Sequence, residues 1–115
     1  ELHDLEAKVR RAMEFRGARY IHIFVPCPLG WGHAAEDTIR ISRLAKETGL
    51  FPVFEAEAGE VVSVSKIRRQ APVEAYLRPQ KRFAHLFGAT PRTEVIGRIQ
   101  AIADRNIRRY GLLGN

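Results

Sequence analysis

Cysteine is nearly absent from this sequence: one thiol, Cys27, occurs in 115 residues. A single cysteine excludes an internal disulfide and weakly favours a reducing, cytoplasmic setting. Long hydrophobic runs are absent too, and because a membrane-spanning helix needs roughly 20 apolar residues, we expect no membrane partner. The chain starts at Glu1 without a methionine, which fits a processed product, a cloned piece or a fragment of a longer polypeptide, and its start shows no signal-peptide pattern.

Acidic residues are scarce in the second half of the chain. Residues 60–115 carry 11 Lys and Arg against 4 Asp and Glu, whereas residues 1–59 carry 8 against 9. A nucleic-acid binder usually has a dense basic patch with interleaved aromatic residues, and the basic clusters at 66–69 and 81–82 are too short for that. We therefore expect no nucleic-acid partner. The basic half favours contact with an acidic protein surface or a neighbouring subunit.

An apolar run over residues 20–25 ends abruptly in Pro26, Cys27 and Pro28. Its length and its β-branched and aromatic content are typical of a strand buried on both faces of a parallel sheet. The two prolines have no N–H to donate, so Cys27 is predicted on a rigid turn at the carboxyl end of the strand. Open α/β sheets bind ligands at that end. On composition alone, however, a lone cysteine is more often a small buried hydrophobe.

Periodicity predicts the remaining elements. The first helix should end at Gly17 with Met13 in the core, and a second should run from about residue 34 to 48. A short helix begins at Pro72, and a last helix begins at Thr90 and Pro91, an N-cap followed by proline, and ends at Gly111, with residues 112–115 frayed. The predicted class is therefore α/β, in the order α-β-α-β-β-α-α with an incomplete sheet.

The two middle strands form a predicted β-hairpin near residues 51–65, with Gly59 in the left-handed turn position. Because alanine disfavours positive φ, Ala58 favours a type I turn with a glycine bulge over a type I′ turn. Glu55 and Glu57 share one face of the first strand and are predicted to be solvated.

Three blocks in order carry a family resemblance: FVPCPLGW, then TIRISRLAKETGLFPVFEAEAGE, then PVEAYLRPQKRFAHLF. From about Arg19 to Phe87 the chain resembles the C-terminal part of the β subunit of pyruvate:ferredoxin oxidoreductase and its 2-oxoacid:ferredoxin oxidoreductase relatives. The third block matches the family pattern at the following positions: Tyr76, Leu77, Gln80, Arg82, Phe83, His85 and Leu86. We interpret it as a docking segment.

The resemblance implies cofactors and one site residue. The family's β subunit carries thiamine diphosphate with Mg²⁺ and a [4Fe–4S] cluster held by four cysteines, the last of them in the Pro-Cys pair, which is Cys27 here. Nothing in this sequence matches the other three ligands or the Gly-Asp thiamine motif, so the resemblance names no catalytic residue. It implies that residues 1–87 are the end of the thiamine-binding α/β domain and residues 88–115 a C-terminal helix.

The resemblance also implies an activity for the whole enzyme: oxidative decarboxylation of a 2-oxoacid such as pyruvate to an acyl-coenzyme A, with electrons passing to ferredoxin. The partners would be the other subunits and ferredoxin, and the chain alone would be inactive. The resemblance does not identify the substrate.

The alternative to membership of such an enzyme is a standalone basic interaction module with an incidental cysteine. A reactive-thiol enzyme is disfavoured because the prolines withhold N–H groups that would stabilise a thiolate. His22 is expected to be a core or interface residue, and a zinc site of Cys27, His22 and His33 is disfavoured because it matches no zinc pattern.

Overall fold

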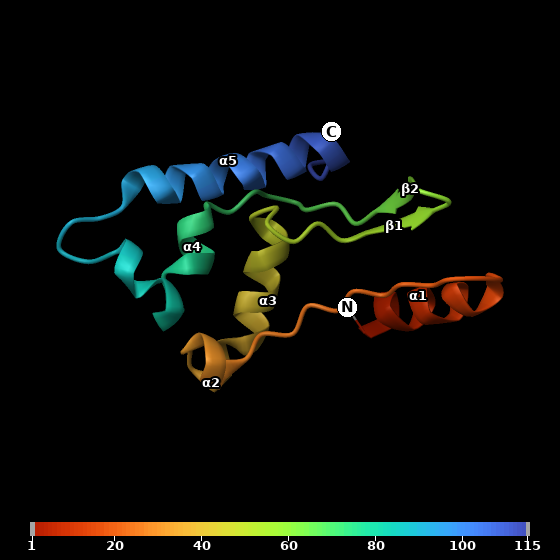
Figure 1. The fold of residues 1–115 in the computed structure, drawn as a ribbon, viewed down its shortest axis with the longest axis horizontal. Helices are drawn as coiled ribbons and strands as arrows, with labels where there is room; N and C mark the ends of the chain where they lie inside the picture. Colours follow the sequence, from red (N-terminus) through yellow and green to blue (C-terminus); the bar gives the residue numbers. More distant parts are fainter. Residues whose placement is uncertain (1, 115) are drawn as a thin grey trace.

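The core of the protein lies where three helices meet, as a computed structural model of residues 2–114 shows (Figure 1). These are α3 (Thr38–Glu47), α4 (Val73–Leu77) and α5 (Thr93–Tyr110). Ile41 and Ala45, four residues apart on α3, are fully buried, and they pack in one cluster with Leu77 of α4 and Ala103 of α5. Spacing of three or four residues places side chains on one helical face, so each helix buries a single stripe.

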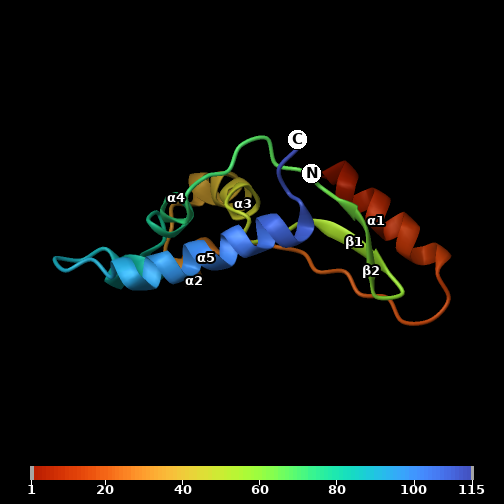
Figure 2. The ribbon, with the colours of Figure 1, turned by 90° about the horizontal axis from the view of Figure 1, so that it is seen from above.

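The remaining elements are α1 (Leu2–Glu14), α2 (Pro28–Trp31), the 3₁₀ turns η1 (Ala35–Asp37) and η2 (Lys81–Leu86), and the strands β1 (Phe54–Glu57) and β2 (Glu60–Val64). The molecule is elongated, with principal extents of 53 × 31 × 25 Å. The α3–α4–α5 core and α2 occupy one end, and α1 and the hairpin occupy the other (Figure 2). None of the helices in the described residues is long and apolar enough to cross a bilayer.

Several predicted helix boundaries are confirmed, because local backbone chemistry determines them. The helix predicted over residues 34–48 forms as η1 followed by α3, and Gly49 follows it with a φ of 81°. A Cβ at Gly49 would lie 2.7 Å from Ile107, so α5 can approach only a glycine there. Pro72 is the N-cap of α4, and Gly111 ends α5 in the left-handed conformation. The predicted start of the last helix at Thr90 and Pro91 was wrong, because Arg92 is the N-cap and α5 begins at Thr93.

The C-terminal segment after α5 is more ordered than predicted. Leu112 is 1 % exposed, its carbonyl accepts a hydrogen bond from the N–H of Ile67 at 2.8 Å, and Leu113 forms a parallel bridge with Ile67. Fraying at Leu112 and Leu113 was therefore a wrong prediction, since both have partners far away in the sequence. Asn115 lies outside the described residues.

The strand predicted at residues 20–25 does not form within the described residues. The stretch crosses from α1 to α2 without helix or strand structure (Figure 1), and the only sheet among residues 2–114 is the β1–β2 pair. Ile23 and Val25 are 54 % and 69 % exposed. A strand requires a hydrogen-bonded neighbour, and the described chain supplies none for this segment. The α-β-α-β-β-α-α order therefore differs from the structure in two places: its first strand is missing from the described residues, and the short helix α2 was not predicted.

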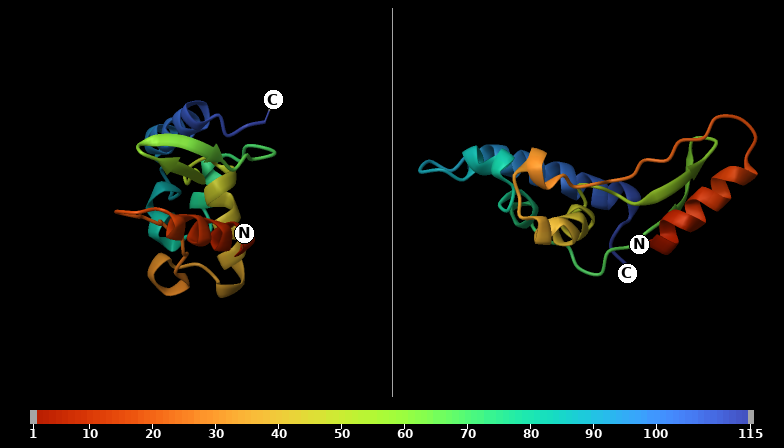
Figure 3. Two further views of the ribbon diagram at one scale, coloured as in Figure 1. Left: turned by 90° about the vertical axis from the view of Figure 1, so that its right-hand side faces the viewer. Right: turned by 90° about the horizontal axis from the view of Figure 1, so that it is seen from below.

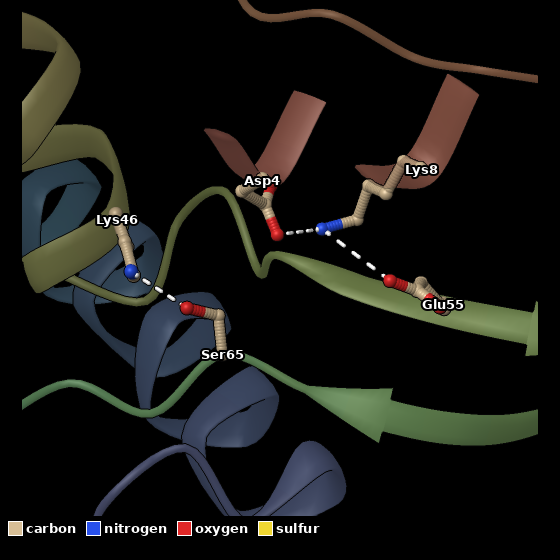
Figure 4. Close-up of polar contacts among 5 residues, drawn as sticks. All are labelled: Asp4, Lys8, Lys46, Glu55 and Ser65. Atoms are coloured by element: carbon tan, nitrogen blue, oxygen red, sulfur yellow. Dashed lines mark hydrogen bonds and ion pairs between the residues drawn. The ribbon is translucent and has the colours of Figure 1, made fainter. Parts of the chain in front are cut away.

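Helix α1 contacts the rest of the molecule through charges. Lys8 lies 3.8 Å from Glu55 and also pairs with Asp4 (Figure 4), and Arg11 donates to Glu57 at 2.9 Å. The expectation that these two glutamates are simply solvated was wrong: both are half-buried beneath α1. Glu57 and Glu14 raise the pKa of Arg11 by accepting hydrogen bonds from its guanidinium.

The apolar stripe of α1 does not form a core contact. Met13, predicted in the core, is 69 % exposed, and α1 has no buried residue. The contacts of α1 with the hairpin are to the carboxylates of Glu55 and Glu57, and Leu5 and Ala12 of the stripe are half-buried without joining either core cluster.

The hairpin turn differs from its predicted type. β1 and β2 pair antiparallel, and Ala58 and Gly59 form the two-residue connection with φ values of 50° and 88°. Positive φ at both central residues is the signature of a type I′ turn, whose twist matches that of the flanking strands. The twist preference therefore outweighs the cost of left-handed alanine, which is about 1–2 kcal/mol. The predicted bulge at Gly59 is absent from the turn, and the pairing of the two strands shifts register between Glu55 and Ala56.

Candidate functional site

Cys27 caps a single helical turn, and its thiol is exposed. The Cys27 backbone is extended, with φ −112° and ψ 106°, and Pro28 begins α2. The Sγ accepts a hydrogen bond from the N–H of Gly30 at 3.3 Å, and the Cys27 carbonyl accepts one from Trp31 at 2.9 Å. We call residues 27–32 the Cys27 turn.

The Gly30 N–H corrects one argument from the sequence. The flanking prolines donate nothing, as expected, but the helical turn that follows them supplies a donor three residues further along. This N–H···S hydrogen bond orients the exposed sulfur on the turn. The turn can therefore present Cys27 as a metal ligand.

The Cys27 turn is joined to η2 by a close backbone approach. Gly32 has a φ of 68°, and its carbonyl accepts a hydrogen bond from the N–H of Lys81 at 2.9 Å. A Cβ at Gly32 would lie 2.7 Å from the Cβ of Lys81, a separation that non-bonded atoms do not tolerate. Glycine is required here for both conformation and space.

Aromatic side chains surround Trp31, the only tryptophan of the chain. Phe24 packs on Trp31 with ring centroids 5.5 Å apart, and Phe24 in turn packs on Phe51 at 4.9 Å. The guanidinium of Arg82 lies 3.9 Å from the Trp31 ring centroid. Trp31 therefore anchors the turn onto the core.

The histidines do not assemble a metal centre with Cys27. The described residues contain no group of three or more His, Cys, Asp or Glu side chains placed to hold a metal ion. His22 is exposed and packs edge-on against Phe51, so within this chain it is not a core residue. His33 is buried; its Nδ1 contacts the carbonyl of Ala34 at 2.8 Å, and its Nε2 has no partner.

Several curated proteins resemble this chain over most of its length. It is 49 % identical over 109 residues to the pyruvate synthase subunit PorB of Methanosarcina barkeri, covering 95 % of this chain and 37 % of the relative. Identity to PorB of Methanocaldococcus jannaschii is 41 % over 109 residues, covering 95 % and 35 %. The chain belongs to the pyruvate:ferredoxin oxidoreductase β-subunit family. The resemblance inferred from the sequence is thereby confirmed.

A relative that is not named as a pyruvate synthase subunit is also similar to this chain. The ketoisovalerate oxidoreductase subunit VorB of Pyrococcus abyssi is 35 % identical over 85 residues, covering 72 % of this chain and 27 % of the relative. No family model matches the chain. It spans little more than a third of the length of the two PorB relatives described above. All of these names are those of enzyme subunits, which supports a subunit role for this chain in a 2-oxoacid:ferredoxin oxidoreductase family.

The close approach at Gly32 generates a stability prediction. We expect Gly32→Ala to destabilise the chain by more than the roughly 1–2 kcal/mol that left-handed alanine alone costs, because the methyl group also collides with Lys81. Urea unfolding monitored by circular dichroism measures the difference.

Gly59→Ala is the matched control, since Gly59 also has positive φ but has no atom within 4 Å of an added Cβ. Equal losses in the two variants would mean that the Cys27 turn is not held against η2.

Proposed function

We propose that this chain contributes the last cysteine ligand, Cys27, to a [4Fe–4S] cluster in a 2-oxoacid:ferredoxin oxidoreductase. The observation that carries the proposal is a thiol displayed on a turn, with a backbone N–H directed at its sulfur. A cluster requires thiolates, and N–H···S hydrogen bonds and exposure are among the features that set its potential. One thiol does not hold a cluster, so the other ligands come from chain outside these residues.

The donor chemistry of the turn fits this role better than the alternatives. A buried structural cysteine would not leave its Sγ exposed, and a redox-active thiol would need a second cysteine to resolve its oxidised form. When bound, the cluster supplies one-electron transfer. The chain's own part is to hold one thiolate at a fixed position and to pack Trp31 and Phe24 behind it.

For the whole enzyme we propose the reaction that the family implies. A 2-oxoacid and coenzyme A become an acyl-coenzyme A and carbon dioxide, and the released electrons leave singly for ferredoxin. Thiamine diphosphate with Mg²⁺ belongs to chain outside these residues, because none of the described residues matches its motif. The chain alone is therefore expected to be inactive, and it is the cofactors that carry the chemistry. Pyruvate is one candidate substrate, and the VorB relative makes a branched 2-oxoacid another.

The assignment of Cys27 is tested in the assembled enzyme. Cys27→Ala removes the thiolate, so we expect loss of one cluster's iron and of most ferredoxin reduction, measured by iron analysis and by electron paramagnetic resonance (EPR) of the reduced protein. Leu29→Ala is the control, because Leu29 is on the same turn and is 96 % exposed. Full iron content with normal ferredoxin reduction in Cys27→Ala would refute the assignment.

We further propose that residues 20–25 form a strand in the complete subunit by pairing with chain outside these residues. An open concavity of about 1800 Å³ lies between α1, α3 and the hairpin, and all of the residues 20–24 line it. Nearly two thirds of the length of the relatives lies outside the matched region. Unpaired apolar backbone beside so large a concavity fits a sheet whose other strands are supplied from that remainder.

Hydrogen exchange tests the strand. We expect the amides of residues 20–25 to exchange at least about 100-fold more slowly in the complete subunit than in this chain, because ladder hydrogen bonds protect them only there. Amides of α3, which packs in the core of this chain, are the internal control and should be protected in both. Equal exchange of residues 20–25 in the two proteins would contradict the pairing.

The basic face of α5 is proposed to contact an acidic surface, either another subunit or ferredoxin. Arg98, Arg105 and Arg109 are exposed on α5 while Ile96 and Ile107 pack inward. Glu94 forms an ion pair with Arg98 at 2.6 Å, which offsets part of the positive charge of Arg98. The guanidinium of Arg109 lies over the ring of Tyr110. Clustered charges on one face speed encounter and fix orientation, and salt screens them.

Reversing the three charges to Glu should slow ferredoxin reduction or weaken subunit assembly, with the wild-type advantage shrinking as salt rises. Stopped-flow kinetics with ferredoxin and size-exclusion chromatography measure the two effects. Reversal of Arg10, Arg16 and Arg40, exposed in the charge-balanced first half, is the control. Unchanged assembly and unchanged ferredoxin kinetics at low salt would show that the three α5 arginines are ordinary surface residues.

A further inference from the structure

Arg82 joins the third block of the sequence to the Cys27 turn. Its Nε donates to the side-chain oxygen of Gln80 at 2.8 Å, and its Nη2 donates to the hydroxyl of Tyr76 at 3.1 Å. Gln80 is fully buried and donates from Nε2 to the carbonyl of Tyr76 at 2.5 Å. Each partner of the guanidinium is thus fixed by the core, so the plane of the guanidinium is fixed too.

The faces of this guanidinium lie against aromatic rings. Arg82 lies 3.9 Å from the ring centroid of Trp31 and 4.6 Å from that of Phe83. Trp31 is four residues after Cys27, and its backbone N–H donates a hydrogen bond to the Cys27 carbonyl. A cation stacked on tryptophan is attracted by about 0.5–2 kcal/mol. The stack therefore holds the cysteine-bearing turn against α4 and η2.

The charge of Arg82 is not neutralised locally. Its two hydrogen-bond acceptors, Gln80 and Tyr76, are neutral, and no carboxylate within the described residues forms an ion pair with it. Two arginines of the second half differ in this respect: Arg78 pairs with Glu74, and Arg98 pairs with Glu94. The turn that displays the thiol is accordingly accompanied by a cation that is exposed to solvent and has no carboxylate partner among the described residues.

We propose that Arg82 is a positioning residue that holds the Cys27 turn through Trp31 and raises the reduction potential of the cluster bound at Cys27. This inference rests on the proposed cluster ligation by Cys27. A [4Fe–4S] core with thiolate ligands is negatively charged and gains a further negative charge on reduction, and net charge is one determinant of its potential. A nearby cation stabilises the reduced state more than the oxidised state, so the potential rises.

A purely structural role for Arg82 makes a different prediction. If the network served only to fold η2 onto α4, its loss would lower stability but leave the potential of a fully assembled cluster unchanged. The reduction potential therefore separates the two roles, whereas activity alone would not.

The experiment is a reductive titration of the assembled enzyme, with each cluster followed by EPR. Arg82→Gln removes the charge and keeps a planar, hydrogen-bonding end, and Arg82→Lys keeps the charge but loses the planar fork. Arg78→Gln is the matched control, because Arg78 also stacks on an aromatic ring, Phe87, at 4.3 Å but contacts neither Trp31 nor Gln80.

We expect Arg82→Gln to shift one cluster to a more negative potential at full iron content, Arg82→Lys to shift it less, and Arg78→Gln to leave all potentials unchanged. Unchanged potentials in Arg82→Gln at full iron content would overturn the inference while leaving Cys27 as a ligand. Loss of cluster iron in both Arg82→Gln and Arg82→Lys would overturn the inference as well. Arg82→Lys keeps the positive charge, so its loss of iron would mean that Arg82 acts only through folding. Failure of the ligand assignment itself is recognised separately, by full iron in Cys27→Ala.

Discussion

Burial of one stripe of α3 between α4 and α5 is the interaction on which the described structure depends. Ile41 and Ala45 are inaccessible there, and hydrogen bonds join the same elements: Gln100 of α5 accepts from the N–H of Val73 at 3.0 Å, and Asn106 donates to the Gly49 carbonyl at 2.9 Å. Helices satisfy most of their own backbone hydrogen bonds, so this core forms without a sheet. Helix α1 lies apart from the core (Figure 3), and of residues 20–25 only Phe24 packs against it among the described residues.

Features decided by local backbone chemistry could be predicted from the sequence. Gly49 and Gly111 end helices because glycine adopts left-handed φ without strain, and Pro72 precedes α4 because its fixed φ suits a first turn. The family resemblance, carried by three ordered blocks, is confirmed as well. Features that depend on distant partners could not be predicted: the strand at residues 20–25 lacks a neighbour, and Met13 faces no apolar surface. Leu112, by contrast, gains a partner in Ile67 that the local pattern does not reveal.

In the candidate site too, local features could be predicted from the sequence, and features that depend on distant partners could not. Cys27 stands out in the sequence because two prolines bracket the only cysteine, but the N–H that reaches its sulfur depends on α2, a helical turn that the glycine-rich sequence did not suggest. The third block was interpreted as a docking segment, yet Tyr76, Leu77 and Leu86 are buried in the core of this chain. Their spacing is explained by packing within the chain, and Arg82 meets Trp31 only because Gly32 lets the Cys27 turn approach η2.

The position of Cys27 between the two ends of the molecule has a consequence for a cluster ligand. The turn is fixed on one side by the Lys81–Gly32 hydrogen bond and by the Arg82–Trp31 stack, and on the other side it is continuous with residues 20–25, for which we propose pairing in a sheet. A thiolate oriented before the cluster forms loses little conformational freedom when it binds iron. If the sheet that receives residues 20–25 also carries the remaining ligands, then pairing of that strand brings an already ordered thiolate to them, so that sheet completion and cluster assembly are coupled.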